Sequence, residues 1–428
     1  MNISVIILLA IVVAIGLGFA FKINVGLFGI LFAYFIGVFG LGMSVKAVTA
    51  TWSLTLFFTI FAITFFYGFA ISNGTLELIA KKSVYLTRNV PYLIPFVCYG
   101  LCIAMSGIGP GPYAVYAFLS PLIMAIAKEI KMHKMIAVVG IVGGGVAGAF
   151  TSIGMGGGIA KGLIEGAGYV QEAAQFTNRV LINSFIGETI LFIIVYIIFK
   201  GYKVKPSSIE KPVAFNREQK INMILIVLTL ALTIFPTLFS NLVPDSAMLK
   251  TIAKGADVAY VCILGAILGI FFKIGKEKAA FAIVPWNTII LLCGMGMLVS
   301  VAVAAGTIDM IANAISTNVS KTTAPVVMTI LAGAMSFFSS TMGVVMPTLY
   351  PVVPTIVAAT GVAPTALFSV ITLGAAVTGV SPFSSGGGLA LPAIQDEQEK
   401  AVVFKQLLIL PFASLAVIAI LVLVGIIR

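Results

Sequence analysis

The chain has 428 residues, of which 60% are hydrophobic and 9% are charged, and its formal net charge is +11. With a mean hydropathy of +1.16, it carries more apolar surface than a water-soluble core can bury, which excludes a soluble protein and indicates an integral membrane protein. The basic residues lie in short loops between apolar runs, where they set orientation in a membrane, so they do not indicate a nucleic-acid partner.

Helices long enough to cross a membrane need about 20 apolar residues. Because the first positive charge is Lys22, the first apolar run lacks the basic start of a signal peptide and is predicted to be a retained helix. In chain order, the predicted spanning runs are 3–21, 24–43, 52–72, 180–200, 219–240, 257–274, 284–303 and 403–427.

Other apolar segments are interrupted. Segment 92–126 is broken at 106–112 and segment 324–359 at 339–341, and each flank has about 14 to 18 residues. A helix rises about 1.5 Å per residue, so these flanks are short for a full crossing, and both segments are predicted to be re-entrant helical hairpins. Another broken helix follows each hairpin, with its break at 151–155 or 381–385. Irregular backbone at membrane depth lines a protein cavity or binds a ligand.

Two further segments, 74–90 and 306–320, mix apolar and charged residues and are predicted to be helices at the membrane interface. They are either ordinary connectors or arms that link a fixed part of the protein to a moving part. The basic, proline-containing segment 201–218 is predicted to be a solvated linker on the cytoplasmic side. It separates a first half, 1–200, from a second half, 219–428.

The two halves repeat each other. GTLELIA at 74–80 returns as GTIDMIA at 306–312, and the only two tryptophans, Trp52 and Trp286, precede these segments at nearly the same spacing. At one constant offset, the AMS sequence at 104–106 matches 334–336, and the triple glycine at 156–158 matches 386–388. Internal duplication in a hydrophobic chain is typical of secondary transporters, whose binding site lies where the repeats meet near the bilayer midplane.

Loop charges predict the topology. If both hairpins return to the side that they entered, the loops on one side, with Lys22, carry 18 of the 25 Lys and Arg residues and those on the other side carry seven. The richer side is predicted to be cytoplasmic, so both termini face outward and the two halves are inverted. Trp52 and Trp286 are then expected near opposite membrane faces. The predicted fold is an all-α, multi-pass protein of the plasma (inner) membrane, an inverted repeat of about ten transmembrane helices with two re-entrant hairpins.

The chemistry is expected at the four helix breaks. Unpaired amides at half-helix starts attract anions, glycine allows close approach of a ligand, and hydroxyl or carbonyl oxygens can coordinate sodium. None of the breaks contains Lys, Arg or His, so amides and hydroxyls are expected to hold an anionic substrate. Close helix packing is the alternative reason for small residues here. The predicted substrate-binding residues are Ser106, Gly109, Pro110, Gly111, Thr151, Ser152, Ser340, Thr341, Ser384 and Ser385. The predicted sodium ligands are Ser339, Ser340, Thr341 and Ser381.

A single carboxylate lies inside a predicted span. Glu188 lies well within 180–200, and it either carries a coupling proton or pairs with Arg179 or another helix. The four cysteines lie in apolar stretches and are expected to be packing residues. No cofactor is expected, apart from a sodium ion. The single histidine, His133, lies in a loop, which disfavours a histidine base within the membrane.

These motifs resemble the MatC-type malonate and dicarboxylate carriers. The resemblance rests on SNGTLE at 72–77, on the Gly109–Pro110 hairpin with LSP at 119–121, and on GAFTSI at 148–153. More broadly, it implies the ion-transporter superfamily of the divalent-anion/sodium symporters: homodimers whose transport domain moves against a scaffold in an elevator motion, with both domains drawn from both repeats. That family carries Ser-Asn-Thr at its hairpin tips. This chain has Ser339-Ser340-Thr341 at the second tip and Gly109-Pro110-Gly111 at the first.

Together these patterns predict a symporter for a small carboxylate, with a C3 or C4 dicarboxylate as the first expectation, driven by sodium or protons. A transporter of the same fold for a sugar acid, citrate or an inorganic ion in antiport is the alternative. A membrane-embedded enzyme needs several protonatable groups or metal ligands at depth, and this chain offers one intramembrane carboxylate, so no enzymatic activity is expected. A passive channel does not need two occluding hairpins.

Overall fold

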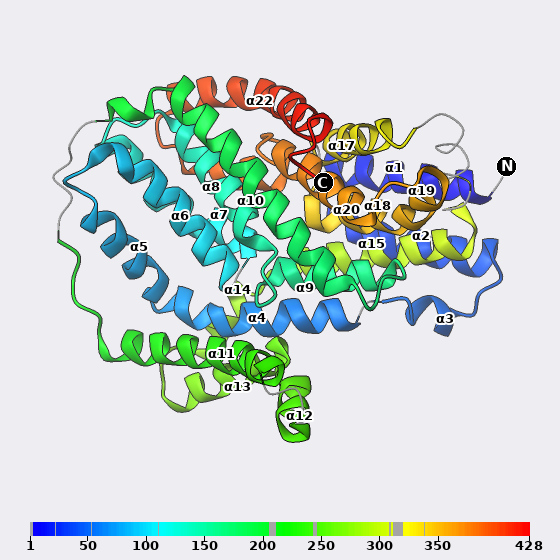
Figure 1. Ribbon diagram of the computed structural model, residues 1–428, viewed down its shortest axis with the longest axis horizontal. Coiled ribbons are helices and arrows are strands. Elements are labelled where there is room, and N and C mark those ends of the chain that lie inside the picture. Colours follow the sequence, from blue (N-terminus) through cyan, green and yellow to red (C-terminus); the bar gives the residue numbers. More distant parts are fainter. Residues whose placement is uncertain are drawn as a thin grey trace. The chain divides into compact units, whose positions relative to one another are not determined.

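The computed structural model describes residues 3–21, 23–52, 54–109, 111–204, 211–242, 246–307, 310, 320–337 and 339–428. All regular secondary structure in these residues is helical, as predicted (Figure 1). The chain forms two compact units. Unit 1 comprises Met1–Phe57, Ile159–Val195 and Trp286–Arg428, and unit 2 comprises Phe58–Gly158 and Tyr196–Pro285. Each unit therefore contains segments from both sides of the linker at 201–218.

Most helices belong to one unit. Unit 1 contains α1 (Ile3–Phe21), α2 (Val25–Phe35), η1 (Ile36–Gly40), α3 (Val45–Thr49), α15 (Trp286–Ala304), α17 (Thr323–Ser336), η4 (Thr341–Val345), α18 (Met346–Leu349), η5 (Tyr350–Val352), α19 (Val353–Thr360), α20 (Pro364–Thr378), α21 (Ser385–Ala390), η6 (Leu391–Ala393) and α22 (Glu397–Leu423). Unit 2 contains α5 (Thr75–Leu86), η2 (Pro91–Leu93), α6 (Ile94–Gly107), α7 (Gly111–Glu129), α8 (Lys134–Ala149), η3 (Gly201–Lys203), α11 (Arg217–Leu242), α12 (Ala247–Gly255), α13 (Val258–Phe271) and α14 (Glu277–Ile283). Three helices have residues in both units: α4 (Leu54–Ser72), α9 (Met155–Gly166) and α10 (Ala173–Ile198).

Several helices are suited to a membrane by length and composition. In the described part of the chain, Ala173–Ile198, Thr341–Thr360 and Glu397–Leu423 meet both requirements, and the number rises from three to five if each of two sharply bent helix pairs forms one span. Many further apolar helices are shorter, among them Lys134–Ala149 and Pro364–Thr378. These helices support an integral membrane protein.

The predicted hairpin flanks need a correction. The first flanks, α6 and α17, have 14 residues each, as expected. The second flanks are longer than expected, because α7 has 19 residues and the helical stretch from Thr341 to Thr360 has 20. The helix α7 continues through Lys128 and Glu129, beyond the end of the predicted hairpin segment at residue 126. At about 1.5 Å per residue, a flank of this length reaches about 30 Å, so length alone does not make these flanks re-entrant.

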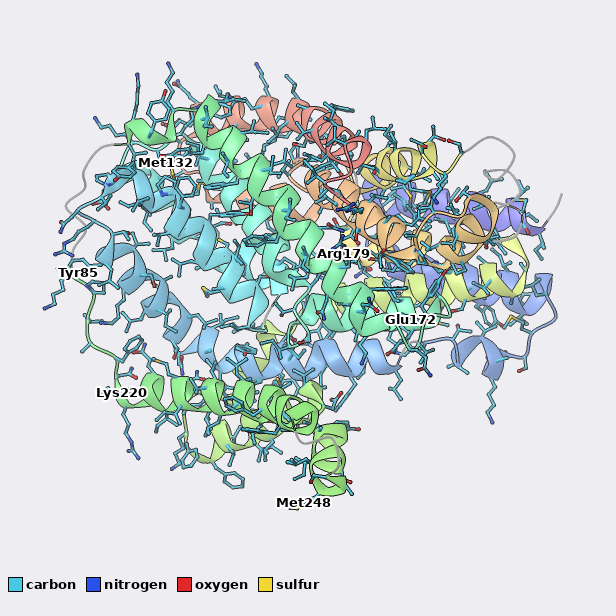
Figure 2. All side chains as sticks on the ribbon, in the orientation of Figure 1. Tyr85, Met132, Glu172, Arg179, Lys220 and Met248 are labelled. Atoms are coloured by element: carbon cyan, nitrogen blue, oxygen red, sulfur yellow. The ribbon has the colours of Figure 1, made fainter. Side chains whose placement is uncertain are left out.

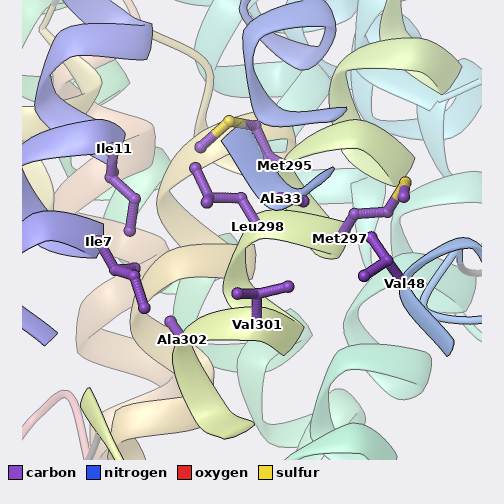
Figure 3. Close-up of a cluster of buried hydrophobic side chains, with 9 residues drawn as sticks. All are labelled: Ile7, Ile11, Ala33, Val48, Met295, Met297, Leu298, Val301 and Ala302. Carbon is purple, nitrogen blue, oxygen red and sulfur yellow. The ribbon is translucent and has the colours of Figure 1, made fainter. Parts of the chain in front are cut away.

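Unit 1 has a hydrophobic core between α1, α2, α3 and α15. Figure 3 shows nine of its side chains, among them Ile7 and Ile11 from α1 and Leu298 and Val301 from α15. Trp52 packs against this cluster, whose α15 residues lie in the second half of the helix. Trp286 is the first residue of the same helix. The two tryptophans thus lie toward opposite ends of α15, and their levels in the membrane stay a prediction.

Glycines allow α2 and α15 to cross closely. A methyl group at Gly29 would lie 2.6 Å from the main-chain oxygen of Gly294, and one at Gly294 would lie 2.2 Å from that of Gly26. Such separations are too short for any side chain, so only glycine fits at this crossing. Small residues at helix crossings are the common device by which helices pack in membranes.

The sequence repeat recurs as repeated contacts, one in each unit. A methyl group at Gly144 of α8 would lie 2.8 Å from the main-chain oxygen of Tyr99 in α6. Its counterpart at the constant offset of the repeat, Gly374 of α20, would bring a methyl group 2.4 Å from the main-chain oxygen of Thr329 in α17. Tyr99 and Thr329 are related by the same offset. The duplication therefore preserves how helices pack, as well as residue types.

A capped bend separates α4 from α5. The two helices meet at 64°, and Gly74 at the bend has a φ of +74°, a left-handed conformation that favours glycine. The Asn73 side chain accepts a hydrogen bond from the Thr75 amide at 3.0 Å and donates one to the main-chain oxygen of Ile274 at 3.0 Å. The predicted helix within 74–90 is confirmed as α5. Residues 308, 309 and 311–319 of its predicted counterpart lie outside the described residues.

Candidate functional site

The second hairpin break and the helix break that follows it lie against each other in unit 1. Ser384 donates its hydroxyl hydrogen to the main-chain oxygen of Ser339 at 2.9 Å. This bond joins the break between α17 and η4 to the break between α20 and α21. Breaks in consecutive elements of one repeat are expected to be adjacent, and for 339–341 and 381–385 this prediction is confirmed.

Most hydroxyls of this pair of breaks bind the local backbone. Ser340 has an extended backbone and caps the following helix, because its Oγ accepts a hydrogen bond from the Gly343 amide at 3.1 Å. Ser339 donates to the main-chain oxygen of Met335 at 2.6 Å, and Ser381 Oγ accepts from the Phe383 amide at 3.2 Å. The Oγ atoms of Ser339 and Ser381 each retain a lone pair with which they can bind a cation or accept another hydrogen bond.

This polar group is shielded from solvent. Ser340, Thr341, Ser381 and Ser384 are at most 8% exposed, and Ser385 is partly exposed at the start of α21. Thr341 Oγ1 lies 3.3 Å from Ser336 Oγ within the break. Buried hydroxyls at the start of a helix stabilise negative charge through their own dipoles and those of the first-turn amides. The arrangement suits an anion or, through the hydroxyl oxygens, a cation.

Unit 2 contains the corresponding pair from the first repeat. Thr151 donates to the main-chain oxygen of Gly107, and the Met155 amide donates to that of Gly109 at 3.2 Å. Gly111 has a φ of +77°, and a methyl group there would lie 2.7 Å from the Met155 Cε. The breaks at 106–112 and 151–155 are thus joined, as in the second repeat. Ser152 is exposed, and Pro110 lies outside the described residues.

The two tips differ in the hydroxyl partner of one corresponding serine. Ser336 has Thr341 as its hydroxyl partner, whereas the corresponding residues of the first repeat are Ser106 and Gly111. Because glycine has no hydroxyl, Ser106 loses this partner. Its Oγ is completely buried and makes no hydrogen bond to any residue that the structure describes. A buried hydroxyl without a partner is destabilising, so it is a candidate for contact with a ligand.

Sequence reasoning missed Tyr67, a residue of α4 that packs on the first hairpin tip. Its hydroxyl donates to the main-chain oxygen of Ile108. A methyl group at Gly109 would lie 1.9 Å from the Tyr67 Cε2, so this ring accounts for the glycine at the tip. Tyr67 lies in an aromatic-rich apolar run, so composition does not distinguish it from its neighbours. The residue at the same helix position in α15 is Val299, so the sequence repeat does not indicate a functional role for Tyr67 either.

Glu188 lies on α10 in unit 1 and is 2% exposed. Pairing with Arg179 is one of the alternatives for Glu188, and the ion pairs of the described residues do not include it. Arg179 Nε donates to the main-chain oxygen of Arg428 at 2.8 Å. Glu188 Oε1 has no hydrogen-bond partner among the described residues. The coupling role of Glu188 stays a prediction.

Cysteine and histidine behave as expected. None of the four cysteines forms a disulfide, and all four are buried. His133 caps α8 by accepting a hydrogen bond from the Met135 amide at 3.2 Å, and its ring stacks on Phe199. Across the described residues, no three His, Cys, Asp or Glu side chains gather into a group that could hold a metal ion.

A cavity in unit 2 lies away from the helix breaks. It has a volume of about 500 Å³ and is lined by α5, the second half of α7, residues 211–213 and Gln219. Charged side chains of both signs, Glu77, Lys81, Glu129 and Lys211, contribute to its wall. Figure 2 labels Tyr85 of α5 and Lys220 of α11, each of which directly follows a cavity-lining residue in the sequence. None of the predicted site residues lines the cavity.

Comparison with known proteins agrees with the resemblance noted in the sequence. Residues 1–149 match the family model described as dicarboxylate carrier protein MatC N-terminus. The resemblance to MatC-type carriers, a family of transporters, is therefore confirmed over these residues. A search of curated protein sequences found no match. Among solved structures, the chain is similar to the YdaH transporter of Alcanivorax borkumensis, with a TM-score of 0.54 and 15% sequence identity, over 88% of this chain and 87% of the other. This similarity shows that the two proteins share a fold.

Proposed function

We propose that this protein is a secondary active transporter of a small carboxylate, most simply a C3 or C4 dicarboxylate, with uptake coupled to sodium or protons. The observation that carries the proposal is the joining of two helix breaks through the Ser384–Ser339 hydrogen bond. The family match over residues 1–149 and the fold shared with a transporter support it.

A carboxylate suits the chemistry of these breaks. The second pair offers buried hydroxyls and the first turn of the helical stretch Thr341–Thr360, and the first pair offers glycine backbone and the unpartnered Ser106 hydroxyl. None of the four breaks contains a basic side chain. Neutral donors of this kind hold an anion without the strong attraction that would hinder its release.

The proposed architecture is an inverted repeat of about ten transmembrane helices in the plasma membrane, with both termini outside and with two re-entrant hairpins. The repeated glycine contacts at Gly144 and Gly374 support the duplication, and the excess of Lys and Arg in one set of loops supports the orientation. An elevator motion and a homodimer complete the proposal, as the resemblance implies.

The coupling cation is proposed to bind at the second tip if it is sodium. The hydroxyl and carbonyl oxygens of Ser339, Ser340, Thr341 and Ser381 lie in one pair of breaks, and hydroxyl and carbonyl oxygens are ligands for hard cations. The alternative is a transporter of the same fold for a sugar acid, citrate or an inorganic ion in antiport, which the same neutral donors would accept.

Uptake into proteoliposomes tests the proposal. The purified protein is reconstituted and offered a panel of labelled malonate, succinate, malate, citrate, gluconate and phosphate, with sodium and pH gradients imposed separately. Uptake of a C3 or C4 dicarboxylate above protein-free vesicles, stimulated by one of the gradients, is the expected result. Uptake of gluconate, citrate or phosphate alone would select the alternative cargo. If no compound enters by either gradient or by exchange with preloaded compound, the transporter assignment is wrong.

A further inference from the structure

A polar face of α10 packs within unit 1 and contains Glu188. Asn183, Ser184 and Glu188 are 1%, 0% and 2% exposed. Side chains four residues apart in a helix lie on one face, and long side chains point back toward the start of the helix. The Glu188 carboxyl group therefore lies on the same face as the Ser184 hydroxyl. Within the part of the chain that the structure describes, neither Ser184 Oγ nor Glu188 Oε1 has a hydrogen-bond partner.

This face is held against α20. Asn183 Nδ2 donates to Ser369 Oγ at 2.8 Å, and a methyl group at Gly187 would lie 2.6 Å from the Leu373 Cδ2. The Leu373 side chain thus fills the space beside Gly187, and a larger residue at position 187 would have to displace it. The same helix α20 ends at Thr378 and leads directly into the break at 381–385.

A second polar contact of α20 reaches the second hairpin. The hydroxyl groups of Tyr350 and Thr372 form a buried hydrogen bond, and Tyr350 lies in the returning flank of the hairpin. Helix α20 thus has polar contacts to α10 through Ser369 and to the hairpin through Thr372. Glu188 is connected through two packed elements to the proposed substrate site.

Among the described residues, no Lys or Arg, Arg428 included, forms an ion pair with Glu188. Helix α20 has no ionisable side chain, and Tyr350 is engaged with Thr372. On α10 itself, Arg179 and Asn183 both donate to the main-chain oxygen of Arg428, each at 2.8 Å. Helix α22 packs on α20 and has its ionisable residues near its start, at Glu397, Glu399, Lys400 and Lys405. Burying a carboxylate without a counter-charge is costly unless the group takes up a proton.

We propose that Glu188 binds and releases the proton that drives transport, and that Ser184 is a positioning residue that accepts the hydrogen bond of the protonated carboxyl group. The inference rests on the proposed function and deepens it. A proton suits this face better than sodium, because sodium needs about six oxygen ligands, whereas this face offers two free oxygen-bearing groups beside the apolar Leu373. Protonation makes Glu188 neutral, and release of the proton restores a carboxylate that has to gain access to water or a cation.

Transport measurements on reconstituted protein test the inference. An imposed gradient of about one pH unit can drive roughly tenfold accumulation when one net proton moves with each substrate. In Glu188→Gln, the gradient is expected to give no stimulation, whereas exchange of labelled for unlabelled substrate persists, because exchange needs no net proton movement. Ser184→Ala should shift the pH at which stimulation is half-maximal and retain exchange. Glu165→Gln, which alters a partly exposed carboxylate paired with Lys161 on α9 in the same unit, is the matched control and should behave as wild type.

A spectroscopic measurement separates folding from chemistry. Infrared difference spectra recorded across a pH titration should show a protonated carboxyl band that is absent in Glu188→Gln and present in Glu165→Gln. Persistent pH-driven uptake in Glu188→Gln would overturn the inference, as would a wild-type protein that exchanges substrate but ignores the pH gradient. Glu188→Asp keeps a carboxyl group and should retain the dependence of uptake on the pH gradient, which controls for variants that fail to fold. If Glu188→Gln and Glu188→Asp both lose the infrared band and all substrate exchange, Glu188 has a structural role. Absence of any substrate exchange by wild type would contradict the proposed function instead.

Discussion

Ser384 and Ser339 are joined by a hydrogen bond from the hydroxyl of the first to the main-chain oxygen of the second, at 2.9 Å. The two residues lie 45 positions apart, in the breaks of two successive helical elements. A carbonyl oxygen in a helix break lacks its usual helical donor, and Ser384 supplies one. This bond joins the two breaks.

Replacing Ser384 with alanine should therefore weaken the contact between the two helix breaks. The loss of one buried hydrogen bond, with its acceptor left in place, is expected to destabilise the protein by about 1 kcal/mol. Substrate affinity should also fall, because the two breaks no longer hold each other in place. Thermal unfolding in detergent and equilibrium substrate binding measure the two effects. Ser385→Ala is the control for stability, because its side chain is partly exposed; an equal loss of stability in both variants would contradict the role of the bond.

The tips of the two hairpins should respond differently to the same substitution. Ser336→Ala removes the partner of Thr341 and is expected to be destabilising by about 1 kcal/mol, whereas Ser106→Ala removes a buried hydroxyl that has no partner and should be neutral or stabilising. If the Ser106 hydroxyl contacts substrate, its loss should weaken substrate binding all the same. Thermal unfolding with and without substrate separates the two effects. A large loss of stability in Ser106→Ala without substrate would contradict this account.

Much of the local fold was predictable because it depends on short-range chemistry. Glycine, proline and clustered hydroxyls interrupt apolar helices wherever they occur, so the breaks near Ser106, Thr151, Ser340 and Ser384 follow from the sequence. The constant offset between the repeats then predicts that the paired breaks form twice. The lengths of α7 and of Thr341–Thr360 were underestimated, because a helix can continue through polar residues at its end.

The partners of particular side chains were less predictable. Tyr67 reaches the main-chain oxygen of Ile108 from a different helix, and no local pattern distinguishes it from the phenylalanines beside it. The contacts of Asn183 with Ser369 and of Arg179 with Arg428 likewise depend on tertiary packing. Sequence spacing could place Glu188 inside a span, but only the structure shows which groups are absent from its surroundings.

Gly109 should tolerate no side chain. In Gly109→Ala, the new methyl group would lie 1.9 Å from the Tyr67 ring, so the ring or the hairpin tip has to move and the bond from Tyr67 to Ile108 is lost. Lower thermal stability and strongly reduced uptake are expected. Gly100→Ala, in the first flank of the same hairpin, is the matched control, because a methyl group there has no atom within 4 Å. Partial recovery in Gly109→Ala combined with Tyr67→Leu would identify the ring as the cause, and no recovery would point to backbone strain.

The two tryptophans test the inverted topology. Loop charges place Trp52 near the outer face and Trp286 near the inner face. Single cysteines introduced at these positions, in a background without the four native cysteines, should react differently with a membrane-impermeant maleimide. In right-side-out vesicles, Trp52→Cys should be labelled, and Trp286→Cys should be labelled only after the membrane is opened. Labelling of both from the same side would mean that the orientation derived from loop charge is wrong.

Any sodium dependence of transport should depend on the second tip, because Ser340 and Thr341 provide hydroxyl oxygens where the first tip has glycine backbone. Thr341→Val removes one hydroxyl at nearly constant volume and is expected to raise the sodium concentration for half-maximal uptake by about tenfold, the effect of roughly 1.4 kcal/mol of lost binding. Thr341→Ser keeps the hydroxyl and should retain the wild-type value. Ser340→Ala should also weaken sodium dependence, and Ser106→Ala should weaken it less than either. An equal or larger effect of Ser106→Ala would contradict a site at the second tip. If wild-type transport is indifferent to sodium and follows the pH gradient, the assignment of sodium to Ser339, Ser340, Thr341 and Ser381 is wrong, and the proton alone is the coupling ion.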